Sequence, residues 1–138
     1  MIRKIKLPVV LVATSISSFT TPFLGSSVNV ALPAIASDFS MSALGLSWVA
    51  SSFIMAAAIM LLPLGRLADL HGRKRFFFWG SIIVGLSSLA CNFSPNEAVF
   101  IALRVVQGAG SAMIFSTGTA MLISAYPPHR RGMVLGIN

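Results

Sequence analysis

Long apolar stretches without any acidic or basic side chain dominate the pattern of this chain. They run between Lys6 and Asp38, between Asp38 and Arg66, between Arg75 and Glu97, and between Arg104 and His129. Because a helix needs about 20 residues to cross the hydrocarbon core of a bilayer, the pattern predicts transmembrane helices at residues 8–32, 45–64, 76–92 and 98–126. Strands of a membrane barrel would be about half as long and would alternate strictly between apolar and polar residues, and these stretches do neither.

The end of the chain suggests a further element. Residues 126–132 have the composition of a loop, and another apolar run begins at about residue 133. We interpret this run as the start of a fifth helix that is cut off at residue 138. The expected fold class is therefore an all-α integral membrane protein, with four transmembrane helices and the start of a fifth in residues 1–138.

The composition supports a lipid environment. The chain is 56% hydrophobic and 9% charged, with a mean hydropathy of +0.88, whereas an ordinary soluble domain is about 25% charged. The formal net charge of +7 comes from short clusters between the apolar runs and not from an extended basic face, which argues against nucleic acid as a partner. Cys91 stands alone, so neither a disulfide nor a metal site is expected, and no cofactor is implied.

The basic residues fall in every second connecting segment. They are Arg3, Lys4 and Lys6 at the N-terminus, Arg66, Arg73, Lys74 and Arg75 in the second loop, and Arg130 and Arg131 after the fourth helix. Since basic residues are retained in the cytoplasm, we expect a multi-pass protein of the cell membrane with a cytoplasmic N-terminus. The basic start also resembles a secretory signal, but the first stretch is long and three more follow, which favours an uncleaved helix.

Small and polar residues recur at helical spacing in two of the stretches. The fourth has a small residue at every fourth position, and the first has a polar stripe with a proline and an asparagine close by: Gly108, Ala112, Ser116 and Ala120, and Thr14, Ser18, Thr21 and Gly25 with Pro22 and Asn29. Small residues allow helix backbones to approach closely, so the first pattern predicts a helix–helix contact. The polar stripe either packs on a neighbour or lines a water-filled cavity.

Arg104 is the one charged residue inside an expected span. It lies about six residues from the outer end of the fourth helix, or about 9 Å into the membrane at a rise of 1.5 Å per residue. A buried Arg in a membrane is costly unless it faces protein or water, which makes Arg104 a candidate functional residue together with Gln107, three positions on. The alternative is that Arg104 extends to the outer interface and anchors the helix there.

The second loop holds two glycines and one acid besides its basic residues. Gly65 allows close helix approach or a helix end, and Gly72 allows a tight turn. Asp69 lies four residues before Arg73, and the two either form a surface ion pair, which contributes little, or Asp69 caps a neighbouring helix N-terminus. The residue types alone leave both open.

This loop resembles the major facilitator superfamily, whose pattern between helices two and three is G-x-L-A-D-x-x-G-R-[KR]. All seven specified positions match, as Gly65, Leu67, Ala68, Asp69, Gly72, Arg73 and Lys74. A second family pattern, R-x-x-Q-G in helix four, matches Arg104, Gln107 and Gly108. Residues 28–35 and the start of the second stretch at Trp48 are similar to the branch of fourteen-helix drug:proton antiporters.

The resemblance implies part of the N-terminal bundle of a secondary transporter, and not an enzyme. The expected function is efflux of an amphipathic drug or small molecule by alternating access, with protons as the coupling ion. The loop motif would latch the cytoplasmic side of the outward-facing state. Arg104, Gln107, Gly108 and Asn29 would serve proton coupling or line the cavity. Both histidines, His71 and His129, lie in basic loops and suggest no catalytic constellation.

Three positions depart from the pattern of that branch. Leu24 stands where an intramembrane Asp is common, Phe53 where a Tyr is common, and Ser116 where a Pro is common. No acid remains in any expected span. A transporter of another metabolite is therefore one alternative, and a truncated or oligomeric membrane protein that does not transport is another.

Overall fold

The computed structural model describes residues 7–138 and shows an all-α protein. Its five helices are α1 (Leu7–Phe39), α2 (Ala43–His71), α3 (Arg73–Cys91), α4 (Glu97–Ala125) and α5 (Pro128–Ile137). Three of them are long and apolar enough to cross a membrane, over Val9–Phe39, Ala43–His71 and Glu97–Ala125. The third expected span, residues 76–92, corresponds to α3, which is shorter and begins with three basic residues.

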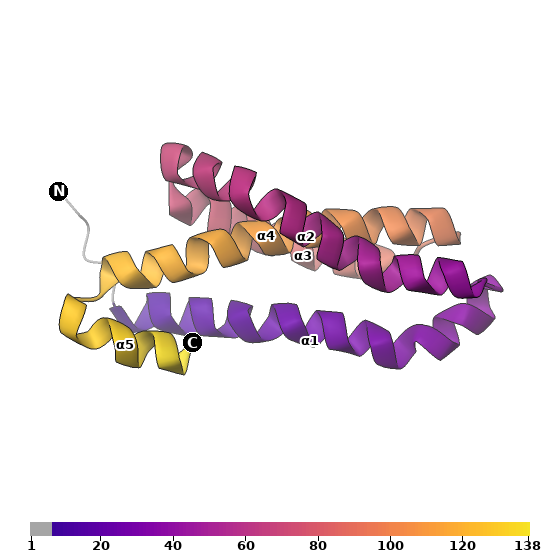
Figure 1. Cartoon of the computed structure of the whole chain (residues 1–138), viewed down its shortest axis with the longest axis horizontal. Coiled ribbons are helices and arrows are strands. Elements are labelled where there is room, and N and C mark those ends of the chain that lie inside the picture. Colours follow the sequence, from indigo (N-terminus) through magenta and orange to yellow (C-terminus); the bar gives the residue numbers. More distant parts are fainter. Residues whose placement is uncertain (1–6) are drawn as a thin grey trace.

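Helix α4 is the centre of the packing. It lies along α2 on one side and α3 on the other, and these three helices form one layer (Figure 1). Helix α1 runs along this layer, and α5 turns back beside the beginning of α1. The side-chain amide of Asn138 donates a hydrogen bond of 2.9 Å to the hydroxyl of Ser18, which joins α5 to α1.

Glycines on two faces of α4 explain how closely α2 and α3 approach this helix. A Cβ built on Gly108 would lie against the carbonyl oxygen of Phe53 and 3.0 Å from the Cβ of Ala56, both on α2. A Cβ on Gly110 would lie 3.1 Å from the carbonyl oxygen of Gly80 on α3. Because hydrogen atoms replace side chains at these points, the backbones approach closely, which is how membrane helices gain packing energy.

The small-residue pattern expected in the fourth stretch therefore faces a neighbouring helix. Gly108 and Ala112 are buried. Further along α4, the side chain of Ser116 lies 3.3 Å from where a Cβ on Gly65 of α2 would be. The pattern thus marks the contact between α2 and α4.

The helices run further than the apolar stretches predict. Helix α1 continues past the predicted end at residue 32 to Phe39, and α2 continues past residue 64 to His71, where Gly72 at φ 103° ends it. Charged residues end an apolar stretch, but they do not end a helix, because its backbone hydrogen bonds are internal. Most of the expected second loop is therefore the last two turns of α2.

The fifth helix also begins earlier than expected, at Pro128 instead of residue 133. Pro127 caps it and Pro128 occupies its first turn, where a fixed φ favours the helix and the missing N–H costs nothing. The segment interpreted as a loop thus contains the first half of α5.

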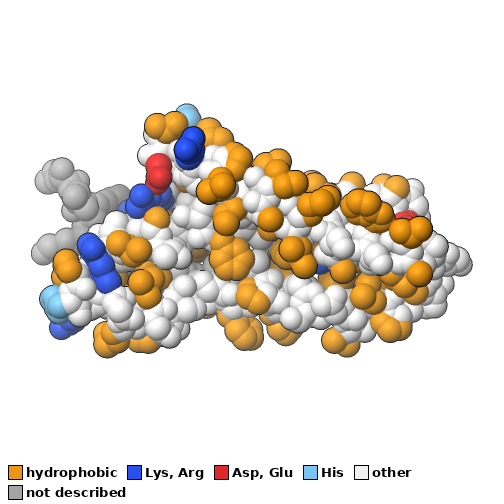
Figure 2. Space-filling view, in the orientation of Figure 1, with side chains coloured by type: hydrophobic (Ala, Val, Ile, Leu, Met, Phe, Trp, Pro, Cys, Tyr) orange, Lys and Arg blue, Asp and Glu red, His pale blue; other side chains and the backbone are white. Residues whose placement is uncertain are grey.

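The surface of the described residues is apolar along the helices and basic at one end (Figure 2). Large hydrophobic side chains are widely exposed, for example Val30 at 84% and Leu62 at 78%, as expected for a surface in contact with lipid. Exposed basic residues gather where α2 meets α3 and α4 meets α5. Arg3, Lys4 and Lys6 lie outside the described residues, so their part in the orientation stays a prediction.

Candidate functional site

Arg104 is buried between α4 and α2. Its side chain is 2% exposed, and its Nε donates a hydrogen bond of 3.3 Å to the carbonyl oxygen of Val49. The guanidinium carbon lies 4.6 Å from the centre of the Phe53 ring, which places the cation over an aromatic face. The guanidinium is therefore held against α2 and is not exposed at the surface of the described residues.

A polar connection continues from Arg104 across α4 to α3. Arg104 Nη1 donates to the side-chain oxygen of Gln107 at 2.6 Å, and Gln107 Nε2 donates to the hydroxyl of Ser88 at 2.6 Å. The Ser88 hydroxyl in turn donates to the carbonyl oxygen of Val84 at 2.7 Å. Three helices are thus linked through side chains at one level, which fixes the rotation of α4 against its neighbours.

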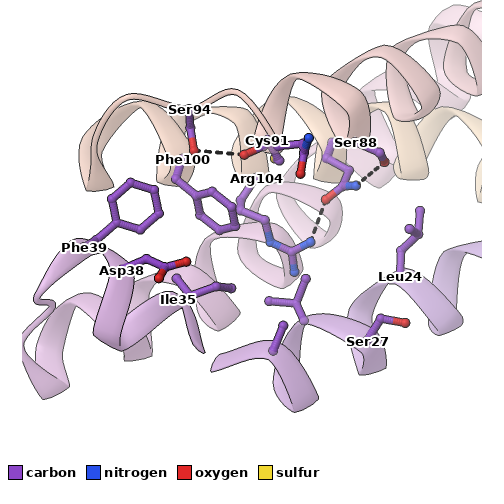
Figure 3. A pocket seen from close by; sticks show the side chains of 14 residues that line it. Leu24, Ser27, Ile35, Asp38, Phe39, Ser88, Cys91, Ser94, Phe100 and Arg104 are labelled. Carbon is purple, nitrogen blue, oxygen red and sulfur yellow. Dashed lines mark hydrogen bonds between the residues drawn. The ribbon is translucent and has the colours of Figure 1, made fainter. Parts of the chain in front are cut away.

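Two cavities meet at Arg104. The larger, of about 410 Å³, lies between α1, α3 and α4 (Figure 3). Its walls are mainly apolar, with polar groups from α3, α4 and the two ends of the cavity: Leu24, Ser27, Val28, Ala31, Ile35, Asp38, Phe39, Ser88, Cys91, Asn92, Ser94, Phe100, Arg104 and Gln107. The second, of about 310 Å³, lies between α1, α2 and α4 and includes Thr21, Asn29 and Phe53.

The charge of Arg104 has no acidic counterpart nearby in residues 9–138. The ion pair found there joins Arg73 to Asp69, and no carboxylate approaches Arg104 within 4.0 Å. Asp38 lines the same cavity as Arg104, but its side chain is exposed. The hydrogen-bond partners of Arg104 are neutral, so they orient the guanidinium without cancelling its charge.

The candidate residues predicted in the first and fourth helices all lie near Arg104 or line one of its two cavities. Arg104 and Gln107 are hydrogen-bonded partners, as their spacing suggests. Gly108 faces α2 and brings that helix close to Arg104. Asn29 is exposed but lines the second cavity, and Thr21 of the polar stripe is buried beside it.

A second cluster lies at the basic end of the molecule, where α2 turns into α3. Arg73 Nε donates to Asp69 Oδ1 at 2.7 Å, so the side chains form the local ion pair, and Arg73 Nη1 also donates to the carbonyl oxygen of Ala120 at 3.3 Å. Gly72 makes the turn with a φ of 103°, and its N–H donates to the carbonyl oxygen of Ala68 at 2.9 Å. Arg73 thereby ties the turn to α4.

The other members of the motif have simpler positions. Ala68 is buried at 1%, and Gly65 packs against Ser116 of α4. Leu67 and Lys74 are exposed. A cavity of about 520 Å³ lies beside the cluster and is lined by Asp69, His71, Gly72, Arg73, Lys74, Arg75, Met121 and Ser124. Within the described part of the chain, no group of acidic, His and Cys side chains could hold a metal ion.

Comparison with known proteins decides the family. Residues 14–138 match the Major Facilitator Superfamily. The chain belongs to this superfamily. The match and the three long apolar helices together make it a multi-pass membrane protein.

Several transporters of the superfamily are similar to this chain. The riboflavin transporter RibZ of Clostridioides difficile is 30% identical over 94% of the chain and 28% of the relative. The multidrug resistance protein Stp of Mycobacterium tuberculosis is 36% identical over 85% and 22%. The cephamycin export protein CmcT of Amycolatopsis lactamdurans is 36% identical over 84% and 24%. The chain spans about a quarter of the length of these relatives.

Three contributors to the site in this superfamily member were not predicted from its sequence. Ser88 accepts from Gln107, the carbonyl oxygen of Val49 accepts from Arg104, and Asp38, near the end of α1, lines the cavity. A hydroxyl in the middle of an apolar helix is a signal that could have singled out Ser88. No sequence signal identifies a particular backbone carbonyl, because its role depends on how two helices cross.

Proposed function

We propose that the chain is the N-terminal part of a proton-coupled exporter of amphipathic small molecules that works by alternating access in the cell membrane, with a cytoplasmic N-terminus. The observation that carries the proposal is the buried Arg104–Gln107 pair, which lies on the wall of the larger cavity, with Arg104 also lining the second. A buried charge in a membrane marks a substrate or ion pathway by default. The apolar walls suit an amphipathic substrate.

The cluster at the basic end supplies the conformational part of the proposal. Alternating access needs two states of similar free energy, and a ligand shifts them only by binding one better than the other. Arg73 bonds both Asp69 and the carbonyl oxygen of Ala120, so this ion pair holds the α2–α3 turn against the end of α4. A turn fixed in this way would provide a rigid contact surface when the cytoplasmic side of the transporter closes.

Replacing the acid of this cluster tests the proposal. Asp69→Asn removes the charge that orients Arg73 while keeping the size of the side chain, and it should abolish efflux from cells with expression unchanged. The pair is exposed, so its loss should cost the fold under about 1 kcal/mol. Arg66→Gln is the matched control, because Arg66 is an exposed charge in the same turn of α2. Efflux retained in Asp69→Asn cells, at the level of this control, would contradict the latch.

Coupling to protons needs a separate measurement. Everted vesicles that contain the gene product should accumulate a fluorescent drug only while a pH gradient is present, and a protonophore should release it. Accumulation that survives collapse of the gradient would contradict proton coupling but leave transport intact.

Transport of a metabolite is the second candidate function. Leu24 lines the cavity that Arg104 also lines, so position 24 provides no acid to carry a proton or to bind a cationic drug. RibZ, a relative of similar identity, is named as a riboflavin transporter. Parallel uptake and efflux assays on the gene product, with riboflavin and with a cationic drug, distinguish the two candidates.

A further inference from the structure

Arg104 lines the larger cavity and forms no ion pair with any described carboxylate. Arg104 contributes a full positive charge from a side chain that is 2% exposed, and its hydrogen bonds to Val49 and Gln107 engage only Nε and Nη1. Nη2 has no hydrogen-bond partner in the part of the chain that the structure describes. An anion that enters the cavity would supply both a counter-charge and an acceptor for this donor.

On α1, the acid that lines this cavity is Asp38, which makes no ion pair with Arg104. Figure 3 shows the guanidinium directed towards α1, whose side chains here include Leu24 and Ile35. Aliphatic groups can surround the apolar part of a bound molecule but cannot neutralise a cation. The counter-charge must therefore come from whatever enters the cavity, or from a part of the protein that approaches it.

We propose that this cavity binds an amphipathic carboxylate, with the carboxylate on Arg104 and the apolar body between α1 and α4. A planar guanidinium pairs well with a carboxylate, because its donors match the two oxygens and the hydrogen bonds are charge-assisted. Phe100 and Val28 provide apolar surface in the same cavity. The proposal rests on the proposed function and adds the charge of the substrate to it.

Asp38 is the one acid that lines this cavity, and it has to be reconciled with an anionic ligand. It lies near the end of α1 with an exposed side chain and makes no ion pair with Arg104. Water screens a charge in that position far more than it screens Arg104. Asp38 therefore belongs to the mouth of the cavity and leaves the site at Arg104 cationic.

A matched series of probes tests the charge preference directly. Tritiated pyrenebutyrate, its methyl ester and pyrenebutylamine share one apolar body and differ in charge. Binding to the purified gene product in nanodiscs is measured by scintillation proximity, with empty nanodiscs subtracted. We expect the carboxylate to bind about tenfold or more tightly than the ester and the amine. An ester or amine that binds the unaltered protein as tightly as the carboxylate overturns the proposal.

Two substitutions at one position provide the matched control. Leu24→Asp places a carboxylate on the wall opposite Arg104, so it should reduce the preference for pyrenebutyrate to about onefold or reverse it. Leu24→Asn adds similar bulk and polarity without charge and should keep the preference. Equal loss in both variants would contradict the proposal, and so would a preference retained in Leu24→Asp. Asp38→Asn should leave the preference in place or increase it.

Transport separates this proposal from the one on which it rests. If the gene product binds pyrenebutyrate selectively but exports none of the probes, the proposed export function is refuted and the proposed anion site is supported. If it exports the amine with no preference for the carboxylate in binding, the exporter stands and the anion site fails. The comparison on the unaltered protein decides the matter even if an aspartate at position 24 prevents folding.

Discussion

The contact between α2 and α4 depends on the absence of a side chain at Gly108. A methyl group there would press on the carbonyl oxygen of Phe53, lie 3.0 Å from the Cβ of Ala56 and lie 3.2 Å from the backbone nitrogen of Ala57. Two of these three atoms are backbone, so they move only if the helices separate. Gly108→Ala should therefore push α2 away from α4.

The size of the effect follows from two contributions. Overpacking in a close contact costs about 1–3 kcal/mol. Separation of the helices also stretches the hydrogen bond of 3.3 Å from Arg104 to Val49, whose loss costs about 0.5–1.5 kcal/mol. Together, Gly108→Ala should lower the free energy of unfolding by roughly 1.5–4.5 kcal/mol.

Two other glycines serve as controls for the same substitution. A Cβ on Gly118, also in α4, would meet its nearest neighbours at an ordinary 3.9 Å, and a Cβ on Gly85 in α3 would meet nothing within 4 Å. Because Ala is the better helix former, Gly85→Ala should be neutral or stabilise by up to about 1 kcal/mol. All three variants are compared by denaturant titration of the purified protein in micelles. Equal stability of Gly108→Ala and Gly118→Ala would refute the reasoning.

Two further predictions use the same titration. Ser88→Ala removes the acceptor of Gln107 Nε2 and should lower the free energy of unfolding by about 1–3 kcal/mol, because a buried amide loses its partner. Ser87→Ala removes a hydroxyl that is bonded only to its own helix, so it should lower the free energy of unfolding by less. Equal effects of the two substitutions would refute the role of the Arg104–Gln107–Ser88 connection. Gly72→Ala places a side chain at a φ of 103° and should lower the free energy of unfolding by about 1–2 kcal/mol. Gly132→Ala, within α5, adds a methyl group in open space and should leave the stability unchanged. Unchanged stability of Gly72→Ala would show that the turn relaxes to accept the side chain.

The proposed anion site and the proposed latch lie towards opposite ends of α4. Arg104 is in the second turn of α4, and Arg73 contacts the helix near its other end, at Ala120. Both are attached to the same straight element, and α2 packs along it between them. A change in charge at Arg104 that rotates or shifts α4 would therefore reach the α2–α3 turn without any other moving part. This coupling requires only that the two ends of one rigid helix move together.

The sequence alone determined the class of the protein, its family and most of its helices. Hydropathy is a property of each residue and its transfer to lipid, so long apolar stretches indicate membrane helices without knowledge of their neighbours. The loop motif and the Arg104–Gln107–Gly108 motif identified the superfamily for a similar reason, since they are fixed patterns in one short segment. Hydropathy marks only where the apolar stretches end, which is why α1 and α2 run beyond the predicted limits.

Only the tertiary structure decided the surroundings of Arg104. Spacing predicted its bond to Gln107 within one helix, but its contacts with Val49 and Phe53, and the bond from Gln107 to Ser88, join residues far apart in the chain. These contacts depend on how α4 is rotated against α2 and α3, and that rotation is set by the glycines at which the backbones meet. A sequence records that such glycines exist, but not which backbone each one touches, because close packing is a property of two helices together.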